Sequence, residues 1–302
     1  MFCGNDRDNS EFLKASSGYS APVRIGNWNN ELAIQEEKAN ITAYKKERCQ
    51  LLVAKTRKML KNVLQPDRLS EAIETLDYGA VYQVCAAELP NTIEPKHPKQ
   101  TKGLYLSGLM DESDVDQGTN FMHGCRITAS PDKIACTRNT FFFTSAENKL
   151  GNIKYGEDLF IQLHRANSDL PPLYLQAEYS TFDNFGGHLM ARLSAYPDVY
   201  CHFKILHWNA RMRKDSIGSK VVPNVTVIIQ HIASGRNLAA EHTKWIPTFF
   251  GPECLVSCHT FQNQNRMETA ENMWKIVSHR QPDKGMIIRA AKGEDIPAEL
   301  LE

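Results

Sequence analysis

Tyr78-Gly-Ala-Val-Tyr-Gln-Val84 and Tyr155-Gly-Glu-Asp-Leu-Phe-Ile-Gln-Leu163 are two copies of one pattern, in which Tyr-Gly is followed by a short apolar run. Glycine permits a tight turn, and apolar residues at every second position then point into a core, so each copy predicts a β-strand entered through a turn. A weaker third copy, Val222-Pro-Asn-Val-Thr-Val-Ile-Ile-Gln230, lacks the Tyr-Gly pair. The chain therefore contains three similar stretches of predicted β structure.

Each copy is followed by a second short apolar strand, at residues 104–106, 173–175 and 238–240. The second and third units close on tryptophan-containing strands, 203–208 and 273–277, and the first closes less clearly near 125–128. Three units that cannot bury their apolar faces alone can close around a pseudo-threefold axis. The pattern thus favours a mainly β chain with a β-trefoil-like domain, and the alternative is an irregular β-sandwich.

Trp208 and Trp274 lie on the predicted closing strands, so both are expected in the core. Replacing a buried Trp by Ala costs about 3–5 kcal/mol, and this cost is predicted for Trp208→Ala.

The texture of the sequence divides the chain into four parts. Residues 1–22 are polar and predict an N-terminal arm, 23–66 hold a Gly-Asn-Trp-Asn segment and a long helix, 67–280 form the β domain, and 281–302 form a polar tail. The domain divides into units at about 67–138, 139–210 and 211–280. Copies spaced about 77 and about 67 residues apart imply insertions, the first at 88–102.

Residues 30–64 contain neither Pro nor Gly and are rich in Glu, Lys, Ala, Leu and Gln, which predicts one amphipathic helix. Asn29 or Asn30 can cap its start, and Pro66 ends it. Its apolar stripe is expected to pack against another surface. The stripe consists of Ile34, Ile41, Tyr44, Leu51, Leu52, Met59, Leu60 and Val63.

Composition excludes several classes of protein. Lys plus Arg (35) balance Asp plus Glu (35), so the surplus of cations typical of nucleic-acid binders is missing. No apolar run approaches the roughly 20 residues that cross a bilayer, and the first residues lack the order of a signal peptide. The sequence therefore predicts neither a nucleic-acid partner nor a membrane segment, and a cytoplasmic location with its eight cysteines as free thiols.

Candidate chemistry is sparse, and we expect no enzyme activity, no cofactor and no metal site. The phosphate-binding, dinucleotide-binding, zinc-protease and serine-hydrolase motifs are missing from the sequence. Cys254, Cys258 and His259 invite a zinc site, but their spacing fits a strand with buried cysteines better. The acidic run 111–118 lacks the spacing of calcium ligands and is expected to be a solvated loop. His202, His207 and His259 are possible partners for a catalytic cysteine, although packed histidines explain them as well.

Several segments, in the same order, resemble the cilia- and flagella-associated protein 161 family. They are Val23-Arg-Ile-Gly-Asn-Trp-Asn29 before the charged helix, the Tyr-Gly strand after Asn139-Thr-Phe-Phe-Phe143, Gly235-Arg-Asn-Leu-Ala-Ala-Glu-His242, Phe249-Phe-Gly251, Val256-Ser-Cys-His-Thr260 and Asn272-Met-Trp274. The similarity runs over about residues 22–280 and departs from the family at 1–21, about 85–138 and after 281.

The resemblance implies a structural microtubule inner protein on the luminal wall of the A-tubule in axonemal doublet microtubules. Its partners would be α/β-tubulin and other inner proteins, and its role would be to stabilise the lattice for ciliary or flagellar motility. A ligand-binding β-trefoil module of the lectin kind is a second possibility, although the Gln-x-Trp repeats of sugar-binding trefoils are missing.

The helix carries the sharpest local signal, because residues 38–61 contain eight Lys or Arg and one acid, Glu47. A basic face on a long helix suits an acidic partner such as tubulin. A calmodulin-type target and a solvated face are the alternatives. Trp28 could anchor a partner or fix the helix to the β domain. The candidate partner-contact residues are Arg24, Trp28, Lys45, Lys46, Arg48, Lys55, Arg57, Lys58 and Lys61.

Overall fold

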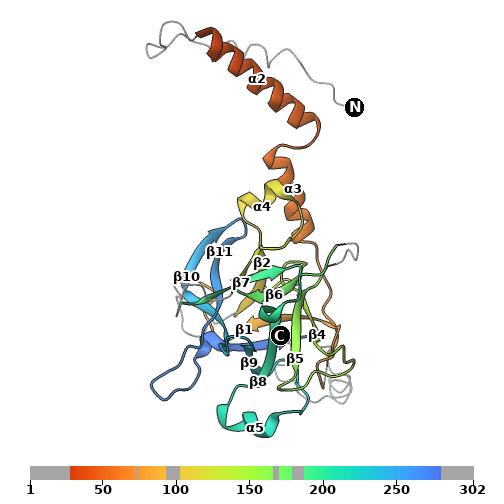
Figure 1. The fold of residues 1–302 in the computed structure, drawn as a ribbon, viewed down its shortest axis with the longest axis vertical. Helices are drawn as coiled ribbons and strands as arrows, with labels where there is room; N and C mark the ends of the chain where they lie inside the picture. The colour runs from red at the N-terminus through yellow and green to blue at the C-terminus, as the bar shows by residue number, and fades with distance from the viewer. Residues whose placement is uncertain (1–27, 73, 93–102, 166–169, 179–186, 280–302) are drawn as a thin grey trace, which may run out of the picture. The chain divides into compact units, whose positions relative to one another are not determined.

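The computed structural model describes residues 28–72, 74–92, 103–165, 170–178 and 187–279 (Figure 1). The predicted arm 1–22, Arg24, most of the predicted insertion 88–102 and the predicted tail 281–302 lie outside these residues. The chain separates into two units, 1–57 and 58–302, which we describe one at a time. The described chain is mainly β, as predicted.

Two helices stand where the sequence predicted one. Helix α2 spans Trp28–Glu47 and helix α3 spans Leu52–Val63. Cys49, between them, has φ of 54°, a left-handed backbone conformation that cannot continue a right-handed helix. The prediction of a single helix over 30–64 is therefore wrong. The break was not visible in the sequence, since the linking residues 48–51 contain neither Pro nor Gly.

The predicted apolar stripe is confirmed at the end of α3 but not in α2. Met59 and Val63, four residues apart on one face of α3, are buried in the core of the β domain. In α2, Ile34, Ile41 and Tyr44 are 46–50% exposed. The apolar side chains of α2 are thus distributed without one buried face among the described residues.

The β domain contains twelve strands within the described residues, and all their pairings are antiparallel. They are β1 (Val81–Ala86), β2 (Leu104–Leu109), β3 (Arg126–Ser130), β4 (Phe141–Ser145), β5 (Asp158–Leu163), β6 (Tyr174–Ala177), β7 (Leu189–Ser194), β8 (His202–His207), β9 (Thr226–His231), β10 (Leu238–Thr248), β11 (Gly251–Cys258) and β12 (Met273–Val277).

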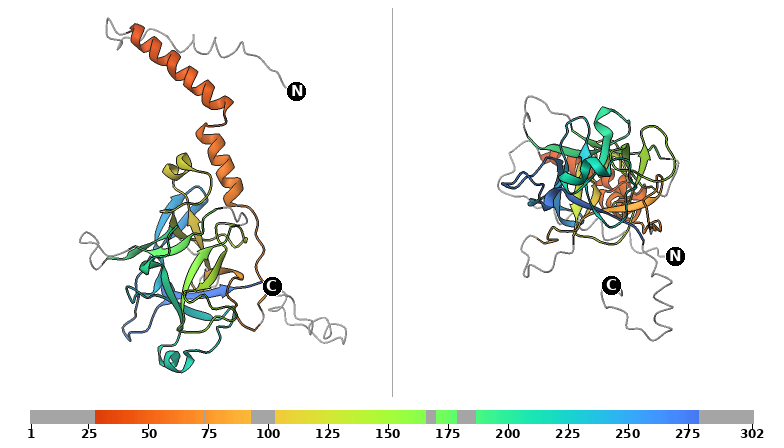
Figure 2. Two further views of the ribbon diagram at one scale, coloured as in Figure 1. Left: turned by 45° about the vertical axis from the view of Figure 1, so that its right-hand side comes forward. Right: turned by 90° about the horizontal axis from the view of Figure 1, so that it is seen from below.

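Six strands close a ring, in the order β1, β4, β5, β8, β9 and β12, with β12 returning to β1. Their side chains alternate, so that Phe141, Phe143, Leu159, Phe203 and Trp274 are buried inside. The Tyr-Gly copies enter this ring at β1 and β5, as the sequence predicted, through Gly79 and Gly156 with φ of 77° and 82°. Figure 2 shows the strands from two further sides.

The other six strands form three hairpins, β2–β3, β6–β7 and β10–β11. One strand of each hairpin pairs with a strand of both other hairpins, through β3–β7, β3–β11 and β7–β11. The hairpins therefore meet one another, and Leu106, Ile127, Leu175, Ala191 and Val256 add buried side chains to the core.

Short helical turns connect some of the strands: α4 (Glu112–Gln117), α5 (Arg213–Ser216), η1 (Val199–Cys201), η2 (Ala210–Met212) and η3 (Ala270–Asn272). Helix α4 corrects the prediction of a solvated loop at 111–118. Asp111 caps its start, and Asp114 accepts a hydrogen bond from the Asp111 backbone N–H in return. An acidic residue at the start of a helix is stabilised by the helix dipole, so the cap gives Asp111 and Asp114 a structural role.

The two tryptophans on the predicted closing strands differ in burial. Trp274 in β12 is fully buried, as predicted, and its indole N–H donates to the Leu238 carbonyl at 2.9 Å. Trp208 is 38% exposed, so its assignment to the core is wrong. The alternation of β8 buries Phe203 and Ile205, at odd positions, and Trp208 follows the strand at an even position, on the outward-facing side.

Candidate functional site

The basic helices hold most of the predicted contact residues. Six of the nine have exposed side chains: Lys45, Lys46, Arg48, Arg57, Lys58 and Lys61. Lys55 is partly buried, whereas the side chain of Trp28 and the whole of Arg24 lie outside the described structure. Partner contact through Arg24 and Trp28 therefore stays a prediction.

In α3, burial of one face directs the cations outward. Met59 and Val63 pack into the β-domain core, whereas Lys58 and Lys61 of the same helix are exposed. Because residues three apart on a helix are neighbours, Lys58 and Lys61 form one basic patch on the domain. This pair is the part of the predicted contact set that lies on a fixed surface of the β domain.

In the first unit, the last turn of α2 carries Lys45 and Lys46, where positive charge suits the helix dipole. Just beyond it, the Arg48 guanidinium lies over the Tyr44 ring, 4.4 Å from its centroid. A cation–π contact of this kind orients Arg48 along the end of the helix. The end of α2 thus presents three cations close together in sequence.

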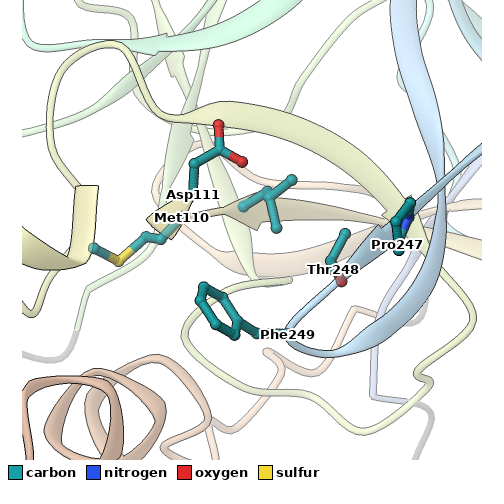
Figure 3. Close-up of a pocket in the computed structure, with 6 residues that line it drawn as sticks. Met110, Asp111, Pro247, Thr248 and Phe249 are labelled. Carbon is teal, nitrogen blue, oxygen red and sulfur yellow. The ribbon is translucent and has the colours of Figure 1, made fainter. Parts of the chain in front are cut away.

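A cavity of about 320 Å³ lies between the end of β2 and the turn from β10 to β11. Figure 3 shows Met110 and Asp111 on one side and Pro247, Thr248 and Phe249 on the other. The Asp111 carboxylate already binds both Nε and Nη2 of Arg126, at 2.9 and 2.6 Å. Because the lining is largely apolar and the Asp111 carboxylate is already paired with Arg126, the cavity is better suited to contact with a partner's side chain than to proton transfer.

Next to this turn lies a fully buried ion pair. Arg138 Nη2 donates to Glu253 Oε1 at 2.6 Å, and Thr128 donates to the other carboxylate oxygen at 2.7 Å. The Arg138 guanidinium also lies over the Phe250 ring at 3.7 Å. Because both charges are buried and partnered, the pair joins β3, β11 and the segment before β4 and is not accessible to a ligand.

The histidines that invited a catalytic interpretation pair with carboxylates or rings. His202 Nδ1 lies 2.9 Å from Asp158, His207 stacks on Trp208, and His259 stacks on His188 with ring centroids 3.9 Å apart. Within the described residues, no hydrogen bond joins a cysteine thiol to a histidine. The structure therefore does not assemble a Cys-His pair in the part of the chain that it describes.

The buried thiols of Cys201, Cys254 and Cys258 are poor nucleophiles. Cys254 and Cys258 lie on β11, fully buried, which confirms the predicted strand. Burial raises the pKa of each thiol to about 12, because the thiolate would lose its hydration. Burial likewise raises the pKa of Cys201 to about 12, and Asp198, which accepts its S–H, adds to the shift.

No group of three or more His, Cys, Asp or Glu side chains within the described residues could hold a metal ion. In the same residues, no helix is long and apolar enough to cross a membrane.

Sequence reasoning missed one surface feature, the loop after β8. Trp208, Met212 and Ile217 are exposed there, beside Arg211 and Lys214. The signal was present as Trp208 followed closely by Arg211-Met-Arg-Lys214. It was overlooked because Trp208 was assigned to the core.

Comparison with protein families finds a match to the model of the cilia- and flagella-associated protein 161-like domain, over residues 55–192 and 187–279. Cilia- and flagella-associated protein 161 of Bos taurus is 26% identical over 276 residues, which cover 87% of this chain and 83% of that protein. The proteins of the same name from Mus musculus and Danio rerio are 26% and 25% identical, over 89% and 85% of this chain and 91% and 86% of theirs.

Solved structures are less similar. A Caenorhabditis elegans protein of unknown function has a TM-score of 0.44 at 12% identity, covering 68% of this chain and 97% of that one. The SDF2-like protein from Arabidopsis thaliana has a TM-score of 0.44 at 15% identity, covering 69% and 98%. These scores are too low to assign the fold.

Proposed function

Because the chain belongs to the cilia- and flagella-associated protein 161-like family, we propose that it is a structural, non-enzymatic component of the axoneme of cilia or flagella. More specifically, we propose a microtubule inner protein bound in the lumen of the A-tubule of doublet microtubules, where it stabilises the lattice during motility. The observation that carries the proposal is the family match, which begins at Lys55 within α3 and extends over the whole described β domain.

Charge supports the proposed contact with α/β-tubulin. Tubulin is an acidic partner, and the exposed cations at the end of α2 and on α3 offer the opposite sign. Lys58 and Lys61 are the central pair in this proposal, since the burial of Met59 and Val63 fixes their direction. Neighbouring inner proteins are proposed as further partners.

The pairing pattern supports the proposal that the domain is a β-trefoil. Strands β1–β4, β5–β8 and β9–β12 would form the three units, each giving two strands to the ring and one hairpin. In this scheme β4 ends the first unit, as β8 and β12 end the others, so the first boundary falls after Ser145 rather than at 138. A domain of this kind would serve as a rigid block.

Calmodulin binding is the alternative that the basic helix leaves open. A calmodulin target must offer an apolar face, but Met59 and Val63 of α3 are already buried in the domain. Binding would therefore require α3 to leave the core. This cost makes tubulin contact through exposed cations the better supported function. A ligand-binding role for the β domain has as its structural candidate the cavity in Figure 3, whose only carboxylate is engaged.

The location is tested by extracting axonemes that carry a tagged full-length chain. A luminal protein should resist salt that strips outer-surface proteins and should be shielded from added protease until the tubules are opened. An outer-surface axonemal protein in the same sample serves as the control. Release by salt together with the outer proteins would contradict the luminal location.

The contact is tested with the charge-reversed variant Lys58→Glu/Lys61→Glu, compared with Lys133→Glu, which changes an exposed lysine elsewhere on the domain. We expect the double variant to lose incorporation into doublets and the control to retain it. Equal incorporation of the two variants would show that α3 does not contact the lattice.

A further inference from the structure

A loop after β8 exposes apolar side chains on the β domain. It runs from Trp208 to Lys220 and contains η2 and α5, which project from the end of the domain away from α4 (Figure 1). Trp208 is 38%, Met212 48% and Ile217 64% exposed. Three large apolar side chains exposed within ten residues are unusual for a loop and indicate a surface that meets another molecule.

The backbone of this loop is held in place along its length. Arg213 donates through Nε to the His207 carbonyl at 3.0 Å and through Nη2 to Glu268 at 2.7 Å. At the far end of the loop, the Tyr155 N–H donates to the Ser219 carbonyl at 2.9 Å, and the Gly218 N–H donates to the Tyr155 carbonyl at 3.0 Å. The exposed side chains therefore belong to a fixed surface.

Trp208 and Ile217 both lie near the Tyr155–Gly156 turn. The indole stacks on the His207 ring, which in turn contacts Tyr155 with ring centroids 6.1 Å apart. A Cβ added to Gly156 would lie 3.5 Å from the Ile217 side chain. The two apolar side chains thus belong to one patch, and a stacked indole loses little conformational entropy when it binds a partner.

The same loop also carries exposed positive charge. Arg211, Lys214 and Lys220 are exposed, and none of them forms an ion pair within the described chain. Arg213 is engaged with Glu268, and Asp215 is the one acid between positions 208 and 220. We call Trp208, Arg211, Met212, Lys214, Ile217 and Lys220 the 208–220 patch.

We propose that the 208–220 patch binds an acidic polypeptide segment that carries an apolar side chain. Trp and Arg are the residues that most often dominate binding energy at protein interfaces, and a partly exposed, pre-positioned Trp beside unpaired cations combines both features. Carboxylates of the partner would pair with Arg211, Lys214 and Lys220, and its apolar side chain would lie against Trp208 and Ile217. The proposal concerns residues other than those of the basic helices and does not depend on the function proposed above.

A protein partner suits the patch better than a nucleic acid does. The chain as a whole has no net charge, and three unpaired cations would neutralise few phosphates. Exposed Met and Ile side chains gain most by contacting apolar side chains that a phosphate backbone lacks.

The test uses the full-length chain and a short fluorescent peptide of glutamate and leucine, with binding measured by anisotropy. Two control peptides replace either every Glu by Gln or every Leu by Ser. We expect the Glu-Leu peptide to bind, each control peptide to bind about tenfold more weakly, and the affinity to fall as salt rises from about 50 to about 300 mM.

Variants locate the binding surface. Trp208→Ala/Ile217→Ala should weaken the peptide by about tenfold or more, and Lys214→Glu/Lys220→Glu should do the same through charge. The matched control is Lys133→Glu/Ile134→Ala, which changes an exposed Lys and an exposed Ile on another loop and should bind like the unchanged chain. Circular dichroism checks that each variant is folded.

Three results would overturn the proposal. Undiminished peptide binding by the folded Trp208→Ala/Ile217→Ala variant, with loss in Lys58→Glu/Lys61→Glu, would assign the binding to α3. Tighter binding to a labelled DNA duplex than to the peptide, abolished by Lys214→Glu/Lys220→Glu, would identify a nucleic-acid surface. Self-association of the full chain in sedimentation, lost in Trp208→Ala/Ile217→Ala without any peptide binding, would identify a contact between two copies.

Discussion

Replacing Trp274 by Ala should destabilise the β domain far more than the same change at Trp208. Trp274 is fully buried in the ring strand β12, so its removal leaves a large cavity and costs about 3–5 kcal/mol. The lost indole N–H adds little to that cost, because the Leu238 carbonyl keeps a second donor, the Asn272 side-chain amide, at 3.1 Å. Trp208 is 38% exposed, and Trp208→Ala should cost about 1 kcal/mol or less.

The assay is urea unfolding of the two variants and the unchanged chain, followed by circular dichroism. A shift of the midpoint at constant slope reports the change in the free energy of unfolding. Trp274→Phe keeps an aromatic ring in the core and should lower the free energy of unfolding by about 1–2 kcal/mol, less than Trp274→Ala. This variant provides a measurable value if Trp274→Ala does not fold. Equal costs for Trp274→Ala and Trp208→Ala would refute the assignment of the core.

Three further outcomes follow from the structure. Glu253→Gln should lower the free energy of unfolding by about 3–5 kcal/mol, because it leaves the buried Arg138 charge without its partner; urea unfolding measures this, and a loss below about 1 kcal/mol would contradict the buried pair. Burial alone would raise the pKa of Asp67, but hydrogen bonds led by that from His164 lower it, so the stability due to ionised Asp67 is present above its unfolded pKa of about 3.9 and is lost as pH falls through the lower folded value. Asp67→Asn should flatten that acid limb of the unfolding curve, and an unchanged limb would show that another carboxyl is responsible. Of the seven cysteines in the described chain, Cys49 is exposed and should react with a maleimide in minutes in the native protein, whereas equal labelling of the buried thiols, detected by mass spectrometry, would show that the core opens.

The alternation of apolar residues and the residues that form turns made most of the β domain predictable from the sequence. The Tyr-Gly copies identified β1 and β5, and the short apolar runs identified β2, β6 and β10, because each feature depends on residues adjacent in sequence. The repeat also indicated that the strands share one core. The helix break at Cys49 was not predictable, since a left-handed residue other than glycine has no strong local signal.

Burial was harder to predict than secondary structure. Trp208 and Trp274 stand in similar sequence patterns, but β8 buries its odd positions, Phe203 and Ile205, whereas β12 buries its even positions, Trp274 and Ile276. The position of the indole in the two-residue alternation of its strand therefore decides whether it is buried or exposed. The acidic run at 111–118 gave another error, because its charge indicated a solvated loop, whereas Asp111 and Asp114 cap the short helix α4.

The lysines and arginines predicted as contact residues on the helices were identified by their charge alone. Charge indicates the sign of a partner but not the direction in which each side chain points. The structure adds direction for Lys58 and Lys61, through the buried Met59 and Val63. Arg24 and Trp28 remain predictions, because the structure does not describe their side chains.

Closure of the six ring strands limits how this protein can be joined to others. Each ring strand has a neighbour on both sides, so its backbone amides and carbonyls are already used. Another protein molecule therefore cannot add a strand to the ring. Such strand addition is a common route to unintended polymers. A partner must therefore recognise the ring through its side chains. Replacing a few of these side chains would change the partner without opening the ring.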